Sequence, residues 1–279
     1  MSFTSAKQLK DWIQNLSHRS GVPASTLQQS YLMERFMERV SLSSYRKNVI
    51  LKGGFLIAAM IGADKRSTMD IDTTIKGMPM GRENVEHMLR EVISINVQDN
   101  VVFEIVSIKS IHAVSTYEDF RISLDARIFT IRGNLKIDMT TGDQIIPEEI
   151  EYPFQLMFED RKIPVMAYNL QTILAEKIEA ILSRNVVNTR GRDFYDVYML
   201  LTVNRGHLDR SELLRALYMK AQERNSLQLI KDHKRLLGDI AASPEIDRMW
   251  RQYAQRYPYA KDIALDDTMR ILKWVFEID

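Results

Sequence analysis

The pattern of hydrophobic residues changes near residue 165, and this change limits the possible folds more than any other feature of the chain. Before residue 165, short β-like runs alternate with helical segments, whereas after it nearly all apolar residues recur at helical spacing. Breaks in the helical part fall at Gly191, Gly206, Pro244 and Pro258. The sequence therefore predicts an α+β fold, with a mixed β-sheet core and flanking helices in a first domain (residues 1–165) and a helical C-terminal domain (residues 166–279).

Individual elements of the first domain can also be predicted. Helical spacing predicts helices at residues 6–15, 25–41, 55–61 and 82–95. Alternating or β-rich runs predict strands at residues 69–75, 101–108, 120–131, 135–139 and 165–168. The dipeptide Gly133-Asn134 is typical of a two-residue hairpin turn, so we expect it to join the third and fourth of these strands.

The composition excludes several kinds of protein. Of the 279 residues, 45% are hydrophobic and 27% are charged, and the net charge is +1, all ordinary values for a soluble globular protein. Disulfides, thiolate zinc sites and cysteine nucleophiles are excluded because the chain has no cysteine. The first residues have no apolar signal-peptide core, and the longest apolar stretch, residues 53–63, is far shorter than the ~20 residues that span a bilayer. We therefore expect a cytoplasmic protein without a membrane-spanning segment.

Two aspartates in the strand predicted at residues 69–75 are the first candidates for chemistry. Successive strand residues point to opposite faces, so Asp70 and Asp72 share one face. Two neighbouring carboxylates repel each other unless a cation lies between them, and Mg²⁺ accepts oxygen ligands while leaving positions open for phosphate. By the same alternation, Lys136 and Asp138 share one face of their strand.

Each of these signals also has a purely structural explanation. Aspartates can simply solvate the outer face of an amphipathic strand, although aspartate is depleted in strands. The pair Gly53-Gly54 lies between a β-like run and a helix, where it can be only a tight turn or can bring backbone N–H groups and a helix N-terminus close to a phosphate. A glycine pair, a helix and then a strand with two aspartates, in that order, favour the functional interpretation.

The helix predicted from Leu170 to Arg184 carries a lysine on its apolar side. At about 100° per residue, Lys177 falls within the stripe formed by Ile173, Leu174, Ile178 and Ile181. A lysine there either extends to the edge of the stripe or is buried with a partner, and in a cleft it can bind a triphosphate. On the next helix, Asp193 lies near the edge of the apolar stripe, where it can also oppose the helix dipole, and Asp196 is expected further toward solvent.

Taken in order, these motifs resemble the AbiEii/AbiGii toxin family of the DNA polymerase β-like nucleotidyltransferase superfamily. The resemblance covers residues 52–200, about half of the chain, and rests on Lys52-Gly53-Gly54, Asp70-Ile71-Asp72, Lys136-Ile137-Asp138 with Gly142-Asp143, Leu174-Ala175-Glu176-Lys177 and Arg192-Asp193-Phe194-Tyr195-Asp196. It implies a nucleotidyltransferase core with a helical C-terminal domain. It also implies a toxin of a bacterial toxin–antitoxin system that protects against phage and is encoded beside an AbiEi-like antitoxin.

The resemblance further implies a reaction and roles for single residues. Relatives add nucleotides to tRNA 3′ ends, and GTP binding is associated with the AbiEii type. The implied reaction is therefore Mg²⁺-dependent transfer of a nucleoside monophosphate from GTP or a pyrimidine NTP to RNA, with tRNA the favoured acceptor. The implied roles are metal ligands (Asp70, Asp72 and, as the third carboxylate, Asp138), a phosphate-facing turn (Gly53, Gly54), a triphosphate-binding lysine (Lys177) and a further active-site carboxylate (Asp193).

Charge distribution is the physical clue to the acceptor. Residues 161–256 contain 17 lysines and arginines against 11 aspartates and glutamates, so the helical part is basic and the remainder of the chain acidic. A basic region suits a polyanion such as tRNA, although a solvated surface of mixed charge explains the numbers almost as well. The candidate contacts are Lys231, Lys234, Arg235, Trp250, Arg251, Tyr253, Arg256 and Tyr257.

Two other functions stay open on the sequence alone. The chain can be a nucleotidyltransferase that modifies a small molecule or a protein, although a basic drug would favour an acidic cleft. It can also be a catalytically silent nucleotide-binding interaction protein, which loss of Asp70, Asp72 or Lys177 would indicate; all three are present.

Overall fold

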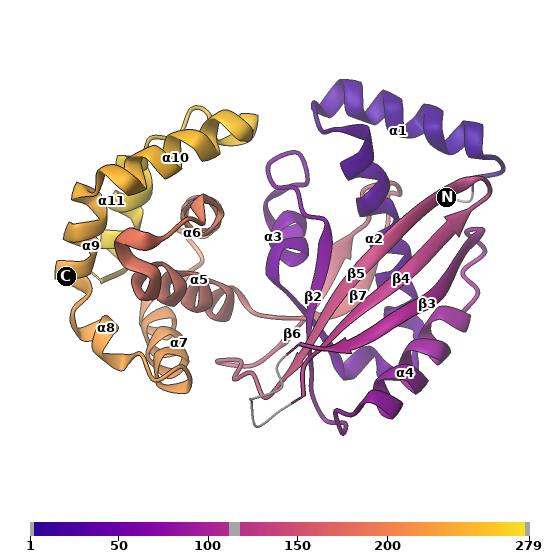
Figure 1. The fold of residues 1–279 in the computed structure, drawn as a ribbon, viewed down its shortest axis with the longest axis horizontal. Coiled ribbons are helices and arrows are strands. Elements are labelled where there is room, and N and C mark those ends of the chain that lie inside the picture. The colour runs from indigo at the N-terminus through magenta and orange to yellow at the C-terminus, as the bar shows by residue number, and fades with distance from the viewer. Residues whose placement is uncertain (1–2, 112–117, 277–279) are drawn as a thin grey trace. The chain divides into compact units, whose positions relative to one another are not determined.

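The computed structural model describes residues 3–111 and 118–276, which form two compact units (Figure 1). Unit 1 comprises residues 1–143 and 150–167, and unit 2 comprises residues 144–149 and 168–279. Unit 1 contains a seven-stranded mixed sheet with helices, whereas the described part of unit 2 is helical. The predicted fold class, α+β with a mixed sheet and a helical C-terminal region, is therefore confirmed.

Unit 1 begins with two helices and then combines strands with shorter helices. Its helices are α1 (Ala6–Ser20), α2 (Ala24–Leu42), α3 (Gly53–Ile61) and α4 (Arg82–Ser94). Its strands are β1 (Val49–Lys52), β2 (Asp70–Ile75), β3 (Val101–Ser110), β4 (Phe120–Ile128), β5 (Ile131–Thr141), β6 (Ile150–Gln155) and β7 (Lys162–Ala167). The strand order is β3-β4-β5-β2-β1-β7-β6, and only the pairs β5–β2 and β1–β7 are parallel.

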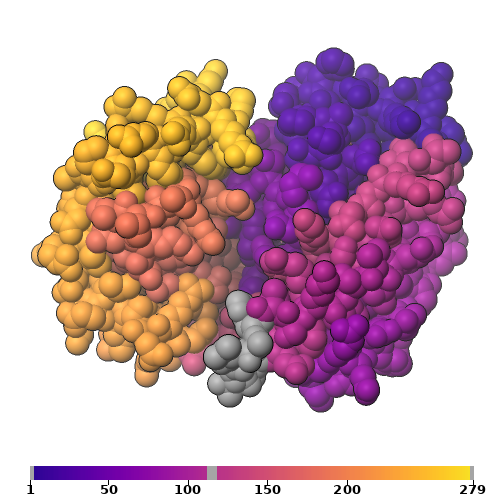
Figure 2. Space-filling view, in the orientation of Figure 1, coloured from indigo at the N-terminus to yellow at the C-terminus, as the bar shows by residue number. Residues whose placement is uncertain are grey.

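The two faces of the sheet differ in polarity. Alternate residues of β4 and β5 are buried, and these form an apolar face against which α2 packs, with α4 packed on β3 (Figure 1). The other face of β3, β4 and β5 carries the exposed residues of these strands, which are mainly polar, although Val102 of β3 is exposed there as well. Figure 2 draws this part of the chain in magenta to pink. Period-two alternation thus separates a core face from a face that is free to carry chemistry.

The β4–β5 hairpin turns four residues earlier than predicted. The prediction that Gly133-Asn134 forms the turn is wrong, because both residues lie inside β5. The turn is Phe129-Thr130, and the hydrophobic residues Ile128 and Ile131 pair across it. Phe129 adopts the left-handed conformation, with φ of 53°, that such tight turns require.

Packing and hydrogen bonding explain why glycine and asparagine occur inside the strand. A Cβ atom on Gly133 would lie 2.4 Å from Leu32 Cδ1, so the glycine allows α2 to approach the sheet closely. The Asn134 amide donates hydrogen bonds to Ser123 Oγ at 2.8 Å and to the Leu124 carbonyl at 3.2 Å on β4. Gly133 and Asn134 therefore have packing and hydrogen-bonding roles inside β5, although this dipeptide usually indicates a turn.

Strand β6 was not predicted, because Pro153 interrupts its pattern. Proline cannot donate a ladder hydrogen bond and is confined mainly to edge strands. The sheet order places β6 at one edge, paired only with β7. Its position at the edge thus explains how a proline-containing segment is part of the sheet.

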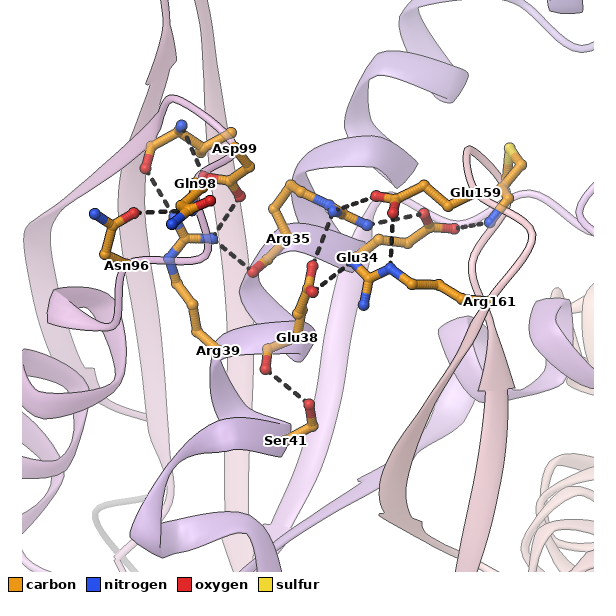
Figure 3. Close-up of polar contacts among 12 residues, drawn as sticks. Glu34, Arg35, Glu38, Arg39, Ser41, Asn96, Gln98, Asp99, Glu159 and Arg161 are labelled. Atoms are coloured by element: carbon orange, nitrogen blue, oxygen red, sulfur yellow. Dashed lines mark hydrogen bonds and ion pairs between the residues drawn. The ribbon is translucent and has the colours of Figure 1, made fainter. Parts of the chain in front are cut away.

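Helix α2 carries four buried charged residues, shown in Figure 3: Glu34, Arg35, Glu38 and Arg39. Arg39 donates two hydrogen bonds of 2.8 Å to the Asp99 carboxylate. Arg35 lies 2.7 Å from Glu159 and 2.8 Å from Glu38. Buried charges are tolerated when each has an opposite charge nearby, and these pairs connect α2 to the segments before β3 and β7.

Glu34 is the exception in this cluster. Its carboxylate accepts a hydrogen bond of 2.8 Å from the Met157 backbone N–H. Burial nevertheless raises the pKa of Glu34 from 4.5 to about 8, against the lowering effects of that hydrogen bond and of Arg35. The free-energy cost of removing this carboxylate from water is thus larger than the stabilisation that the ionised form gains from the Met157 hydrogen bond and from Arg35.

Replacing Glu34 by glutamine should therefore stabilise the protein at pH 8. Between pH 4.5 and about 8 the folded chain holds a proton that the unfolded chain has released, so wild-type stability falls as pH rises through this window. Glutamine cannot ionise, and one pKa unit corresponds to ~1.4 kcal/mol, so the gain at pH 8 should exceed about 1 kcal/mol and vanish near pH 4.5. Denaturant melts across this range test it, with Glu83→Gln at the exposed surface as control. Parallel pH profiles for wild type and Glu34→Gln would contradict the assignment.

Unit 2 is built from α5 (Leu170–Arg184), α6 (Gly191–Asn204), α7 (Arg210–Glu223), α8 (Leu227–Lys231), α9 (His233–Ala242), α10 (Pro244–Arg256) and α11 (Leu265–Phe276). Side-chain caps define several helix starts. Asn169 accepts a hydrogen bond from the Thr172 N–H at the start of α5. Ser243 accepts one from the Ile246 N–H at the start of α10, whose first residue is Pro244. Within residues 3–111 and 118–276, none of the helices combines the length and the apolar character needed to cross a membrane.

Candidate active site

Four charged residues form one row across neighbouring strands of unit 1. The register pairs Lys52 of β1 with Asp72 of β2, Asp72 with Asp138 of β5, and Asp138 with Arg121 of β4. Residues that pair in a sheet share a face, so the row reads Lys52, Asp72, Asp138, Arg121 on the polar side. Asp70, two residues before Asp72 on β2, lies on the same face. We call these four residues and Asp70 the carboxylate row.

Asp72 lies against the glycine turn that precedes α3. Gly53 has φ of +67°, and a Cβ atom added to it would lie 2.0 Å from Asp72 Oδ2. The Gly54 backbone N–H donates a hydrogen bond to the Asp72 carboxylate. Glycine is thus required at position 53 by both backbone conformation and space, and the turn brings the N-terminus of α3 to the aspartate.

The electrostatics of the row favour an added cation. Burial raises the pKa of Asp72, and the neighbouring carboxylates Asp70 and Asp138 raise it further, whereas Lys52 and the Gly54 N–H act in the opposite direction. The Lys52 ammonium is shared, because its Nζ lies 2.5 Å from Asp143 Oδ2. Ionised carboxylates in this arrangement are therefore incompletely balanced by the chain's own charges.

The donor set fits Mg²⁺ through Asp70 and Asp72. Among the described residues, no group of three or more acidic, histidine or cysteine side chains is close enough to share a metal ion. Asp138 is turned toward Arg121, whose Nε and Nη2 donate to its two oxygens at 2.8 and 2.6 Å. Mg²⁺ commonly uses one or two carboxylates together with substrate phosphates, so the Asp70–Asp72 pair is sufficient, and a metal role for Asp138 stays a prediction.

Replacing Gly53 by alanine should destabilise the fold and weaken nucleotide transfer. The methyl group would collide with Asp72, and alanine disfavours the left-handed conformation, so we expect a loss of more than about 1 kcal/mol. The control is Gly238→Ala in α9, where the added methyl meets nothing within 4 Å and should be neutral or stabilising. Thermal melts of both variants test the difference, and equal melting temperatures would contradict the close approach at Gly53.

A second charged cluster lies within unit 2. Lys177 Nζ on α5 lies 2.7 Å from Asp193 Oδ1 and 3.1 Å from Asp196 Oδ2, both on α6. Of the alternatives open for Lys177, the structure therefore has the lysine held by partners rather than extended alone into solvent. The expectation that Asp196 faces solvent is wrong: its side chain is 0% exposed, because α5 packs against that side of α6.

This geometry predicts that a Lys177→Met substitution destabilises the protein. Methionine suits the apolar stripe, but it would remove the lysine cation from the buried carboxylates of Asp193 and Asp196, while Arg184 stays 3.6 Å from Asp193. Removing one partner of a buried ion pair typically costs about 3–5 kcal/mol. Denaturant melts should show this loss, and adding Asp193→Asn and Asp196→Asn to the same chain should restore most of it. A single variant as stable as wild type would mean that the ion pairs have no structural role.

Sequence reasoning missed two residues that contact the aspartates of the carboxylate row, Thr68 and Arg121. Thr68 Oγ1 donates to Asp70 Oδ1 at 3.0 Å, and Lys52 and Asp143, which belong to the recognised motifs, pair with each other. Arg121 was missed entirely. Its signal was the hairpin register, since a turn at Phe129-Thr130 pairs Arg121 with Asp138, whereas a turn at Gly133-Asn134 does not.

The aspartate pair on the mixed sheet, beside a glycine turn that opens a helix, contains two of the motifs on which the family resemblance in the sequence rests. The family profile described as "Nucleotidyl transferase AbiEii toxin, Type IV TA system" matches residues 35–271. Because the match covers most of the chain, the protein belongs to this family of nucleotidyltransferase toxins from type IV toxin–antitoxin systems. The family resemblance seen in the sequence motifs is thereby confirmed.

Solved structures share the fold. A candidate nucleotidyltransferase from H. pylori has 14% identity and a TM-score of 0.51, over 91% of this chain and 96% of that chain. The protein JHP933 from Helicobacter pylori has 13% identity and the same TM-score, over 91% of this chain and 93% of that one. At such identities the likeness concerns the fold alone. No curated protein sequence matches the chain significantly.

Proposed function

We propose that this toxin transfers a nucleoside monophosphate from an NTP to an RNA acceptor, with tRNA favoured, as part of a bacterial defence against phage. The observation that carries the proposal is the carboxylate row, in which Asp70 and Asp72 lie beside the Gly53-Gly54 turn. GTP or a pyrimidine NTP is the proposed donor, and an AbiEi-like antitoxin encoded beside the toxin is the proposed genetic partner.

The residues that the sequence motifs single out each have a proposed task. Asp70 and Asp72 hold Mg²⁺, which when bound promotes ionisation of the acceptor hydroxyl and neutralises charge on the leaving pyrophosphate. The Gly53-Gly54 turn offers backbone N–H groups and the positive end of α3 to the phosphates. Lys177 keeps its proposed role at the β and γ phosphates, and Asp193 its role as a further active-site carboxylate, in addition to the ion pair that they form.

Unit 2 supports a polyanionic acceptor. Arg190, Arg192 and Arg256 surround a cavity of about 250 Å³ together with Tyr253 and Tyr257. Within the described part of the chain none of these three arginines forms an ion pair with a carboxylate. Arginines and tyrosine rings together suit phosphates and unstacked bases. By contrast, Arg235 and Arg251, suggested from the sequence, are paired with aspartates of their own segments.

Asp70→Asn and Asp72→Asn should each abolish transfer while the protein stays folded. Asparagine keeps the size and one acceptor oxygen, so the hydrogen bond from Gly54 to position 72 survives, but the negative charge that holds Mg²⁺ is lost. Loss of groups that only support a metal ligand costs about 10–100-fold, so loss of a ligand itself should exceed 100-fold. The assay is incubation with total RNA and each labelled NTP, with thermal melts to verify folding.

The same assay separates the alternative functions. Label on RNA supports the proposal, and label confined to a small molecule or a protein contradicts the acceptor but keeps the transferase. Binding of an NTP without any transfer would indicate a silent nucleotide-binding protein. Glu83→Gln, an exposed substitution on α4, is the matched control for loss of one negative charge and should retain full transfer.

A further inference from the structure

The polar face that carries the carboxylate row continues along β5 in successive cross-strand rows. Two residues before Asp138, Lys136 pairs with Asp70 and Ser123; the next row is Asn134, Asp125 and Glu104; and the last is Arg132, Arg127 and Val102. All of these rows belong to one continuous sheet in unit 1. At ~3.3 Å per residue, the six residues from Asp138 to Arg132 place the last row about 20 Å from the first.

The far end of this face is hollowed. A cavity of about 470 Å³ is lined by Val102, Glu104, Asp125, Arg127, Arg132 and Asn134, together with backbone of the hairpin. This volume lies within the range of about 300–1,000 Å³ that small-molecule and cofactor sites occupy. The cavity thus has room for a ligand the size of one nucleotide.

Two arginines oppose each other across the strands that line this cavity. Arg127 of β4 and Arg132 of β5 are a directly opposed cross-strand pair, an arrangement that like charges make unfavourable. Within residues 3–111 and 118–276 neither guanidinium has a carboxylate partner, whereas Arg121 on the same face is paired with Asp138. An anion between Arg127 and Arg132 would remove the repulsion, and guanidinium groups match phosphate geometry.

The neighbouring acidic row limits what the anion can be. Glu104 and Asp125 oppose each other beside the arginines, and Asp125 Oδ1 accepts a hydrogen bond of 3.2 Å from the Asn134 amide. These carboxylates would repel an inorganic polyanion. A nucleotide differs, because its base amino groups and ribose hydroxyls donate hydrogen bonds on one side while its phosphate binds arginine on the other.

We propose that this cavity binds one nucleotide of the acceptor RNA, upstream of its reacting 3′ end. Its phosphate lies between Arg127 and Arg132, and its ribose or base donates to Glu104 and Asp125. The RNA strand then runs along β5 from the cavity to the carboxylate row. This inference rests on the proposed function, since it assumes that RNA is the acceptor.

The test is the double variant Arg127→Ser/Arg132→Ser in the full chain. Binding of fluorescent single-stranded RNA, measured by anisotropy at several salt concentrations, should weaken several-fold, and the log–log salt slope should become shallower by about 0.7 for one lost phosphate contact. In transfer assays the KM for RNA should rise, while kcat at saturating RNA and the KM for NTP stay unchanged, because neither arginine touches the reacting groups.

The matched control is Lys10→Ser/Arg19→Ser on α1, which removes two exposed positive charges of the same unit that belong neither to the sheet nor to the residues lining the cavity. RNA length supplies an internal control in the transfer assay: wild type and variant should modify oligonucleotides too short to extend from the carboxylate row to the cavity with equal KM. If melts show that the double variant is unfolded, Arg132→Ser alone replaces it, with the same expectations at smaller size.

The outcomes separate the two proposals. Equal loss in the α1 control and the cavity variant, or unchanged binding of long RNA by the cavity variant, overturns the nucleotide site and leaves RNA transfer standing. Wild-type transfer confined to a small molecule or a protein overturns the proposed function and, with it, this site. A shallower slope and raised RNA KM in the cavity variant alone support both.

Discussion

The parallel pairing of β2 with β5 is the constraint on which the candidate site depends. It places Asp72 directly beside Asp138, on strands ~4.8 Å apart, so two carboxylates lie together on one sheet face. The chain offsets their repulsion with a cation on each side, Lys52 from β1 and Arg121 from β4. Asp70 adds a third negative charge and Lys52 is shared with Asp143, so the balance stays negative where a cation would bind.

The same register also explains the form of the glycine turn. Because β1 pairs with β2 at Lys52 and Asp72, the chain leaving β1 must pass directly over the Asp72 carboxylate. Only glycine has both the space and the positive φ for this passage, and α3 then starts with its positive end at the aspartate. Strand pairing, turn chemistry and electrostatics therefore converge at one residue, Asp72.

Sequence patterns predicted what depends on local periodicity. The shared face of Asp70 and Asp72 follows from a period of two, and the inward position of Lys177 follows from the helical stripe. Relationships between distant segments were not accessible in this way. Tertiary packing decides which helix buries Asp196 and which strand pairs with β2. The local periodicity of a segment contains no information about these partners.

The misplaced hairpin shows how one local error spreads. Gly133 serves the close approach of Leu32, not a turn, and a sequence does not distinguish these two uses of glycine. With the turn moved by four residues, every pairing between β4 and β5 shifts, so Arg121 no longer opposes Asp138 and Arg127 no longer opposes Arg132. The cationic residues of the polar face become visible only with the correct register.

Charge sums have a related weakness. The count of charged residues assigned polyanion binding to the helical part, because that part is basic and the remainder of the chain is acidic. On the polar face of unit 1, however, charges are sorted into rows spaced ~6.6 Å apart along the strands, less than the Debye length of about 8 Å at physiological ionic strength. A ligand laid along β5 therefore meets the sign of each row in turn and not the sum over the domain. A region with a net negative charge can in this way contain a local phosphate site. On this face the row with Arg127 and Arg132 has two positive charges, although the remainder of the chain outside the helical part is net negative.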